Sequence, residues 1–263
     1  MKQLKYLCFI LGLVIVFMII GPLLKIIFNV DPAIFLNTLN DEEIISSIIL
    51  TMRASLYATL FGLVFGIPLA YLLARWNFRG KEIIESIIDI PIIIPHAAAG
   101  IALLGVFGRR FFVGKIFNAI GISFVGTEMG IALAMFFVSV PFLVNSAKEG
   151  FKLIDPRLEN VAMTLGANCF RAFFDITLPL ALRSIASGFI MMWARGISEF
   201  GAVIILAYHP MTASVKIFEQ FEAFGLKFAR PTAVLLIIIC LIIFILLRIL
   251  IRREKGTFGA KRL

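Results

Sequence analysis

The most informative stretch of the chain reads Asp155-Pro156-Arg157-Leu158-Glu159-Asn160-Val161-Ala162-Met163-Thr164-Leu165-Gly166. Aspartate is favoured at the N-cap of a helix and proline at its first position, so Asp155-Pro156 indicates a helix start. Glu159 lies near the first turn, where the helix dipole favours negative charge. Gly166 lies where glycine commonly ends a helix. We therefore expect a short helix over Pro156–Leu165.

This short helix has one apolar face. The residues on this face follow the spacing i, i+3, i+4 and i+7. They are Leu158, Val161, Ala162 and Leu165. Asn168 is placed to cap a second short helix that carries Phe170, Phe173 and Phe174. Short helices are marginal alone in water, so both need a surface to pack against. Two readings are equally open: they pack on their own chain, or the first presents its stripe to a groove in a partner subunit.

The chain on both sides of this loop is strongly apolar. Its 263 residues are 61% hydrophobic and 16% charged, and the mean hydropathy is +1.03. This composition excludes a soluble globule and a disordered chain, and it predicts a membrane protein. A membrane-spanning helix needs about 20 mostly apolar residues. The six candidate spans are Tyr6–Leu24, Ala54–Ala74, Ile90–Gly108, Met129–Ala147, Ser184–Leu206 and Pro231–Leu247.

The distribution of basic residues predicts the orientation. If both termini lie in the cytoplasm, sixteen lysines and arginines fall in cytoplasmic segments, eight fall outside, and one lies within a span. Because positive charge favours cytoplasmic loops, we expect a multi-pass protein of the cell membrane with both termini inside. The net charge of +9 then reflects topology and not nucleic-acid binding. We expect one transmembrane domain over residues 1–263, with its core at about 45–250 and a short basic cytoplasmic tail at 248–263.

The loop resembles a known signature. The run Glu159–Gly166, with the later Ile176-Thr177-Leu178-Pro179, is similar to the Glu-Ala-Ala signature of ABC-transporter permease subunits. Asn160 and Val161 depart from it, and the residues that match it in register are Ala162, Gly166, Ile176, Leu178 and Pro179. The resemblance implies the all-α, six-span fold of type I ABC importer permeases, in which this loop forms a coupling helix seated in a groove of an ATPase subunit. The resemblance therefore favours the second interpretation, in which the apolar stripe binds a groove in a partner subunit.

A charged pair interrupts the fifth apolar segment. Arg195 and Glu199 are four residues apart, so on a continuous helix they share a face and can pair. Ionisable groups inside a membrane are costly and commonly indicate function. Two interpretations stay open: a structural ion pair, or a pair beside the substrate path whose arginine attracts an anion. The small residues Ser198 and Gly201 would let other backbones approach closely.

Two further segments indicate which subgroup of ABC permeases the chain resembles. The run Arg195–Ala202 is similar to permeases for tetrahedral oxyanions, namely sulfate, molybdate and tungstate, and the run Ile88–Ala102 resembles the archaeal molybdate/tungstate subgroup. Pro91 and Pro95 are expected to bend the third span. With His96 and Gly100 they are candidates for a gate wall, although the prolines serve equally well to set packing angles. For His96 a packing role is favoured over a ligand role.

The resemblance also implies an assembly. It consists of a homodimer of this chain, two cytoplasmic ABC ATPase subunits and an extracytoplasmic binding protein that delivers molybdate or tungstate. The chain has no Gly-x-x-x-x-Gly-Lys-Ser/Thr motif, so we expect a permease that is not itself an enzyme, has no cofactor of its own and relies on its partner to bind ATP and Mg²⁺. The three cysteines show no metal-ligand spacing, so no metal site is expected.

The alternatives differ in cargo or in class. A permease for sulfate or another oxyanion would share the signatures. An ion-coupled secondary transporter would need more acidic residues in its spans than Glu199, and it would usually show internal repeats, which are not visible in the sequence.

Overall fold

The computed structural model describes the backbone of residues 2–259 and the side chains of residues 3–249. Most of the expected basic tail at 248–263 therefore has no described side chains, and residues 260–263 lie outside the described part. Every regular element within the described residues is a helix. This confirms the predicted all-α class.

Long helices form the body of the molecule. Five helical segments in the described part are long and apolar enough to cross a membrane. They are α1 (Lys2–Phe28), α3 (Glu42–Arg75), α7 (Glu128–Lys152), α10 (Leu178–Ile197) with the turns that lead into it, and α13 (Leu226–Gly259). Helices α4 (Lys81–Ile93) and α5 (His96–Phe107) meet the same test as a pair bent by 115°. Counted as one broken span, the pair completes the six expected spans.

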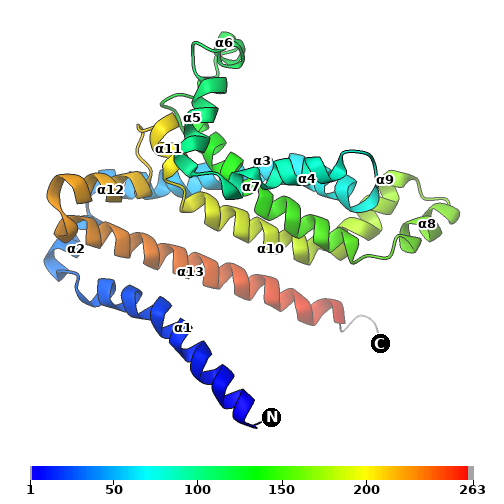
Figure 1. The fold of residues 1–263 in the computed structure, drawn as a ribbon, viewed down its shortest axis with the longest axis horizontal. Coiled ribbons are helices and arrows are strands. Elements are labelled where there is room, and N and C mark those ends of the chain that lie inside the picture. The colour runs from blue at the N-terminus through cyan, green and yellow to red at the C-terminus, as the bar shows by residue number, and fades with distance from the viewer. Residues whose placement is uncertain (1, 260–263) are drawn as a thin grey trace.

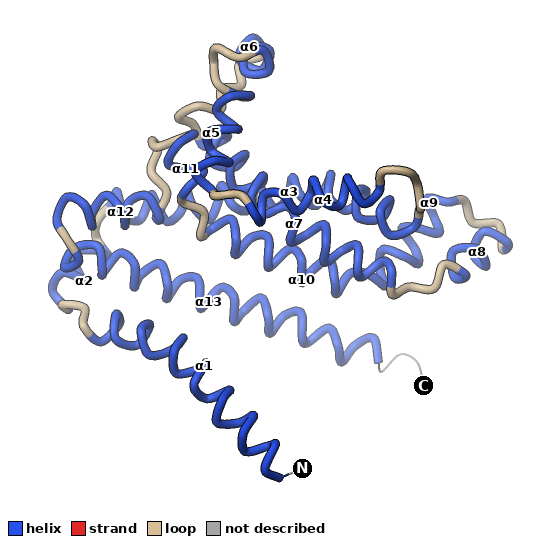
Figure 2. The backbone as a smooth tube through the Cα atoms, viewed as in Figure 1, coloured by secondary structure: helices blue, strands red, loops and turns tan. Residues whose placement is uncertain are grey.

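Short helices connect these spans, and little of the described backbone is loop (Figure 2). They are α2 (Pro32–Leu39), α6 (Phe112–Ala119), α8 (Arg157–Thr164), α9 (Cys169–Ala172), α11 (Gly201–Leu206), α12 (Ala213–Phe224) and a π-helical turn, η1 (Phe173–Thr177). Helices α8 and α9 agree with the two short helices that the loop sequence predicts.

The spans run roughly along one direction (Figure 1). Helices α3, α7 and α10 pack against one another at the centre, and α13 and then α1 lie to one side of them (Figure 1). The start of α1 and the end of α13 lie at the same end of the molecule as α8 and α9, whereas α2 and α12 lie at the other end (Figure 1). Helices α5 and α6 project sideways from the bundle.

Small residues hold the central spans close together. A side chain at Gly188 of α10 would place its Cβ 3.1 Å from the Leu143 Cα of α7. Glycine at such a contact lets two backbones approach, which is how helices associate when lipid removes the hydrophobic driving force. By contrast, none of the apolar window of α1 is buried in the single chain. The buried core centres on α3 and α7, with α5 and α11 packed on one part of them and α10 on another, and α1 is left to contact lipid or another chain.

The third span breaks at only one of its two prolines. Helix α4 continues through Pro91 and ends at Ile93, and α5 begins at His96 after Pro95. Ile94 is extended, with ψ of 148°, because the ring of the following proline disfavours the helical conformation there. Pro95 therefore produces the large bend, while Pro91 is buried inside α4.

The sequence predicts a continuous fifth span over Ser184–Leu206, and this prediction is wrong. Helix α10 ends at Ile197, and α11 begins at Gly201 after a non-helical link. In that link the Glu199 carboxylate accepts a hydrogen bond from the Ala202 amide at 2.9 Å. A side chain that bonds the backbone in this way competes with the helix and starts a new one. Arg195 thus lies in the last turn of α10 and Glu199 between two helices.

Candidate functional site

Both ends of α8 are formed by the residues that the sequence singles out. Asp155 Oδ1 accepts a hydrogen bond from the Arg157 amide at 2.9 Å, which caps the first turn. At the other end Gly166 has φ of +93°, a value that suits glycine. The Gly166 amide donates to the Met163 carbonyl and the Ala167 amide to the Ala162 carbonyl, each at 3.0 Å. This pair of hydrogen bonds closes the helix and reverses the chain.

The apolar stripe of α8 faces away from the protein. The exposed fractions of Leu158, Val161 and Leu165 are 46%, 56% and 83%, and no residue of α8 is buried. Ala162 is only partly exposed, so it does not belong fully to the stripe. The reading in which the stripe packs on its own chain is therefore wrong for α8. An exposed apolar row on a rigid, capped helix is suited to a groove in another protein.

The second short helix behaves differently. Asn168 caps α9 by accepting a hydrogen bond from the Arg171 amide at 2.8 Å. Phe170 and Phe174 are exposed, whereas Phe173 packs on the Tyr71 ring with centroids 4.7 Å apart. The predicted cap is confirmed, but the three aromatic side chains do not share one environment.

Glu159 faces the membrane spans, which the sequence did not reveal. Its Oε1 lies 2.7 Å from Arg75 Nη2 and accepts a hydrogen bond from Thr177 Oγ1 at 2.7 Å. Its Oε2 accepts a hydrogen bond from the Tyr71 hydroxyl at 2.9 Å. Sequence reasoning missed Arg75, Tyr71 and Thr177. Two features of the sequence could have indicated this pairing: Glu159 lies off the apolar stripe, and a basic residue ends the second span.

The remaining residues of the loop signature lead into α10. Ile176 lies half-buried in η1, and Leu178 and Pro179 form the first turn of α10. Leu178 packs on the buried cluster that contains Phe151 and Ile185. The signature residues after Gly166 thus connect the loop that carries α8 to the core.

The second group of predicted residues forms one cluster at the two span breaks. Arg195 Nη2 lies 2.9 Å from Glu199 Oε2 and 2.6 Å from His96 Nδ1. His96 Nδ1 lies 2.7 Å from the same carboxylate oxygen. Arg195 Nη1 also donates a hydrogen bond to Ser198 Oγ at 3.1 Å. The side chains of Glu199, Arg195 and His96 are 0%, 23% and 33% exposed.

Glycines allow α5 and α11 to meet at this cluster. A Cβ on Gly201 would lie 2.8 Å from the His96 Cβ, and one on Gly100 would lie 2.9 Å from the Ala202 carbonyl oxygen. The predicted site residues His96, Gly100, Arg195, Ser198, Glu199 and Gly201 are therefore brought together. Pro95 joins them as the N-cap of α5, while Pro91 lies inside α4. The cluster buries the Glu199 carboxyl group and leaves the Arg195 guanidinium partly accessible to an anion.

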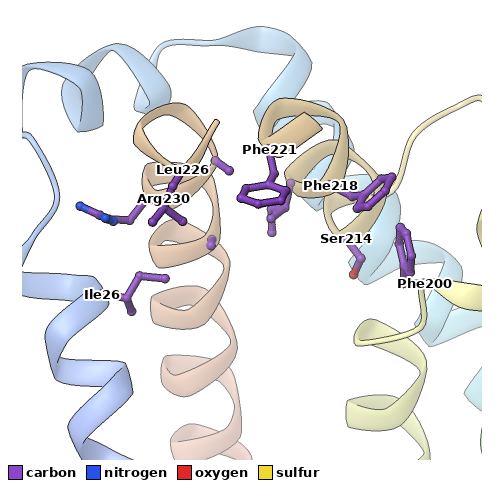
Figure 3. A pocket seen from close by; sticks show the side chains of 10 residues that line it. Ile26, Phe200, Ser214, Phe218, Phe221, Leu226 and Arg230 are labelled. Carbon is purple, nitrogen blue, oxygen red and sulfur yellow. The ribbon is translucent and has the colours of Figure 1, made fainter. Parts of the chain in front are cut away.

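A cavity of about 340 Å³ lies near this cluster, between α12 and α13 (Figure 3). Its walls include Phe200, Phe218, Phe221 and Leu226, and Arg230 is the charged residue among the described side chains that line it. Figure 3 shows the Arg230 side chain extended away from the gap between the two helices, where it donates a hydrogen bond to the Asn29 carbonyl. This apolar cavity does not suit an oxyanion.

A polar cavity of about 420 Å³ lies at the opposite end from α8. It is lined by charged side chains that form ion pairs, namely Arg53 with Glu128 and Lys216 with Glu43. Burial by itself would lower the pKa of Lys216, but the hydrogen bonds and the charge attraction of Glu43 and Glu219 together outweigh it, and the pKa is raised. This face is therefore charged and open, unlike the apolar sides of the bundle.

Comparison with known proteins agrees with this geometry. Residues 62–256 match the family described as "Binding-protein-dependent transport system inner membrane component". The chain belongs to that family. It is a multi-pass permease subunit of the ABC-importer type, as the loop signature predicts.

Relatives of this permease carry informative names. It is 46% identical over 226 residues to "Molybdate/tungstate transport system permease protein WtpB" of Pyrococcus abyssi, covering 86% of each chain. It is 32% identical over 237 residues to "Probable sulfate transport system permease protein cysT" of Chlorokybus atmophyticus, covering 88% of this chain and 82% of the relative.

A solved structure shares the fold of the permease. It is a bacterial alginate ABC transporter in complex with an alginate pentasaccharide-bound periplasmic protein, with a TM-score of 0.75 and 19% identity over 96% of both chains. At this identity the likeness concerns the fold alone. It confirms the predicted type I importer architecture.

Proposed function

We propose that this permease forms the membrane path of an ABC importer for a tetrahedral oxyanion, most specifically molybdate or tungstate. The observation that carries the proposal is the Arg195 cluster, in which a partly accessible guanidinium lies where two broken spans meet. A guanidinium suits a tetrahedral oxyanion because its planar donors match the oxygen atoms. The name of the Pyrococcus abyssi relative supports the choice of cargo.

The buried Glu199 carboxylate gives the path weak affinity. It competes with a passing anion for the same Arg195 guanidinium, since Glu199 Oε2 already lies 2.9 Å from Arg195 Nη2. A path must release its cargo as readily as it admits it. Recognition is then left to the extracytoplasmic binding protein, for which the charged cavity lined by Glu43, Arg53 and Lys216 offers a docking face.

ATP hydrolysis takes place on partner subunits in this proposal. The permease forms a homodimer around a two-fold axis, and each copy presents the apolar stripe of α8 to one of two cytoplasmic ATPase subunits. Those subunits bind ATP and Mg²⁺, so the permease requires no cofactor of its own. In this proposal both termini are cytoplasmic, because the start of α1 and the described end of α13 lie at the end of the molecule that carries α8 (Figure 1).

Reconstitution tests the proposal directly. The permease is placed in liposomes with its ATPase subunits and binding protein, and uptake of molybdate, tungstate and sulfate is measured with ATP and with a non-hydrolysable analogue. We expect uptake only with hydrolysable ATP. Uptake without the ATPase subunits would contradict the proposal and indicate an ion-coupled secondary transporter instead.

Sulfate is the second candidate cargo, favoured by the 32% identity to the relative named for sulfate transport. The three anions share a tetrahedral shape and charge, so the Arg195 cluster alone does not separate them. In the same liposomes, sulfate in excess should leave molybdate uptake nearly unchanged if the importer is built for molybdate or tungstate. Strong competition by sulfate would favour the second candidate.

A further inference from the structure

The docking helix is attached to the spans through one buried charge pair. Glu159 is the residue of α8 that bonds to α3 and η1, and its side chain is 13% exposed, against 7% for that of its partner Arg75. No residue of α8 is buried, so apolar packing contributes little to holding this helix on the bundle. Its position depends on the bonds that Glu159 makes.

Arg75 also connects α8 to the end of α7. It is the last residue of α3, and its Nη1 donates hydrogen bonds to the carbonyls of Phe151 and Ile154, each at 3.0 Å. These carbonyls lie at the C-terminal end of α7, where a cation stabilises the helix and satisfies its free acceptors. One guanidinium therefore joins the ends of α3 and α7 to the docking helix.

We propose that Arg75 and Glu159 are positioning residues that transmit displacement of α8 to α3 and α7. The proposal rests on the proposed function, in which ATPase subunits move α8. If α8 moved alone, the pair would separate and leave two poorly hydrated charges, which is strongly unfavourable. Moving α3 and α7 with α8 keeps every bond. The peptide links on either side of α8 impose no comparable constraint, because loops can flex.

The geometry also separates two roles on the same helix. Leu158, Val161 and Leu165 face outward and are available to the ATPase subunit, whereas Glu159 faces the spans. Substitution of Glu159 should therefore leave ATPase binding largely intact. What it should change is the transmission of movement, which is measured as the amount of anion transported for each ATP hydrolysed.

The first test measures this ratio. Glu159→Gln and Arg75→Gln are reconstituted with the ATPase subunits and binding protein, and molybdate uptake and ATP hydrolysis are recorded together. We expect the ratio to fall by about fivefold or more, with the ATPase subunits still bound in a pull-down. Lys152→Gln is the matched control, since it removes an exposed ion pair with Glu149 at the same end. A ratio equal to that of the control would overturn the proposal.

A milder variant covers the case in which these substitutions prevent assembly. Tyr71→Phe removes only the hydroxyl that donates to Glu159 and keeps the ring that packs on Phe151 and Phe173. It should lower the ratio in the same direction by a smaller factor. An unchanged ratio in Tyr71→Phe, together with lost ATPase binding in Glu159→Gln, would mean that the cluster only shapes the docking loop, and would overturn the proposal.

A second readout needs no cargo, so it separates this proposal from the proposed function. A fluorophore attached through Ser46→Cys, near the outer end of α3, reports movement of that span in the complex with ATPase subunits. The native Cys8, Cys169 and Cys240 are replaced by serine, because the first two are exposed and would also react. ATP should change the emission in this background protein, and adding Glu159→Gln should reduce that change by about fivefold or more. An equal change in both proteins would refute the transmission role even if molybdate proved to be the wrong cargo.

Discussion

At the scale of single residues, Arg195 stabilises the buried side chain of Glu199, so the effect of replacing Arg195 alone is difficult to interpret. Glu199 is fully buried, so the loss of Arg195 alone would leave a buried carboxylate whose remaining partners among the described residues are His96 and the Ala202 amide. Removing one partner of a buried pair costs about 3–5 kcal/mol. Lost transport in Arg195→Ala would thus not distinguish a damaged fold from a lost anion contact. A double substitution is needed.

The double variant Arg195→Gln, Glu199→Gln removes both charges and retains a polar side chain at each position. The side-chain amide that replaces the Glu199 carboxylate can still accept the hydrogen bond from the Ala202 amide, so we expect a folded dimer with a thermal midpoint close to that of the native protein. Uptake should fall by about tenfold or more, because the guanidinium no longer attracts the anion. Uptake in liposomes measures transport, size-exclusion chromatography checks the dimer, and thermal unfolding gives the midpoint. Unchanged uptake would assign the pair a structural role.

The contact between α5 and α11 is sensitive to a single methyl group. Gly201→Ala would place a Cβ 2.8 Å from the His96 Cβ and 3.2 Å from the Ala97 amide nitrogen. Overpacking of this kind costs about 1–3 kcal/mol, so the thermal midpoint in detergent should fall. Gly105→Ala in α5 is the matched control, because nothing among the described residues lies within 4 Å of a Cβ there. A similar loss in both variants would contradict the close approach.

At the scale of elements, features that depend on neighbouring residues were predicted from the sequence, including the ends of α8 and the bend of the third span at Pro95, whereas the break in the fifth apolar segment was not. The cap at Asp155 and the turn at Gly166 depend on neighbouring residues, so the bounds of α8 were predicted to within one residue at each end. The break at Ser198–Phe200 depends on Glu199 reaching the start of α11 and on contact with α5, which lies about a hundred residues away in the chain. The hydropathy of a segment carries no information on contacts with distant parts of the chain, so the fifth apolar segment was predicted as one helix.

The environment of each residue on α8 was only partly predictable for the same reason. Periodicity placed Leu158, Val161 and Leu165 on one face, and the structure leaves all three exposed. The partners of Glu159 come from α3 and η1, and no local pattern in the loop indicates them. The loop sequence thus predicted the helix α8 and its exposed stripe but not how the helix is attached to the spans.

The stripe of α8 should determine the affinity for the ATPase subunit. Burying a large aliphatic side chain contributes about 1.5–3 kcal/mol, so Leu158→Ala and Leu165→Ala should each weaken binding by about tenfold or more. Asn160→Ala is the matched control, since Asn160 is exposed on the opposite face of the helix. Binding of purified ATPase subunit to permease in nanodiscs gives the affinity. Equal affinities for all three variants would exclude the stripe as the docking surface.

At the scale of the whole molecule, the two ends of the bundle differ in chemistry. One end carries the described ends of α1 and α13 together with the docking loop (Figure 1). The other end carries the polar cavity lined by Glu43, Arg53, Glu128 and Lys216. The sequence assigns sixteen basic residues to the first side and eight to the second. The fold places α8 at the same end as the described ends of α1 and α13, and the charge bias predicts that this end is cytoplasmic.

Cysteine labelling tests this orientation, and the chain supplies one reporter. Cys169 in α9 is exposed and lies beside the docking loop. With Cys8 and Cys240 replaced by serine, a membrane-impermeant maleimide should label Cys169 only after the cells are broken. In the matched variant, Cys169→Ser combined with Asn118→Cys places the thiol on α6, which the charge bias assigns to the outer side. That thiol should react in intact cells. The reverse pattern would place the stripe of α8 outside, away from any source of ATP, and would refute both the orientation and the coupling role of the loop.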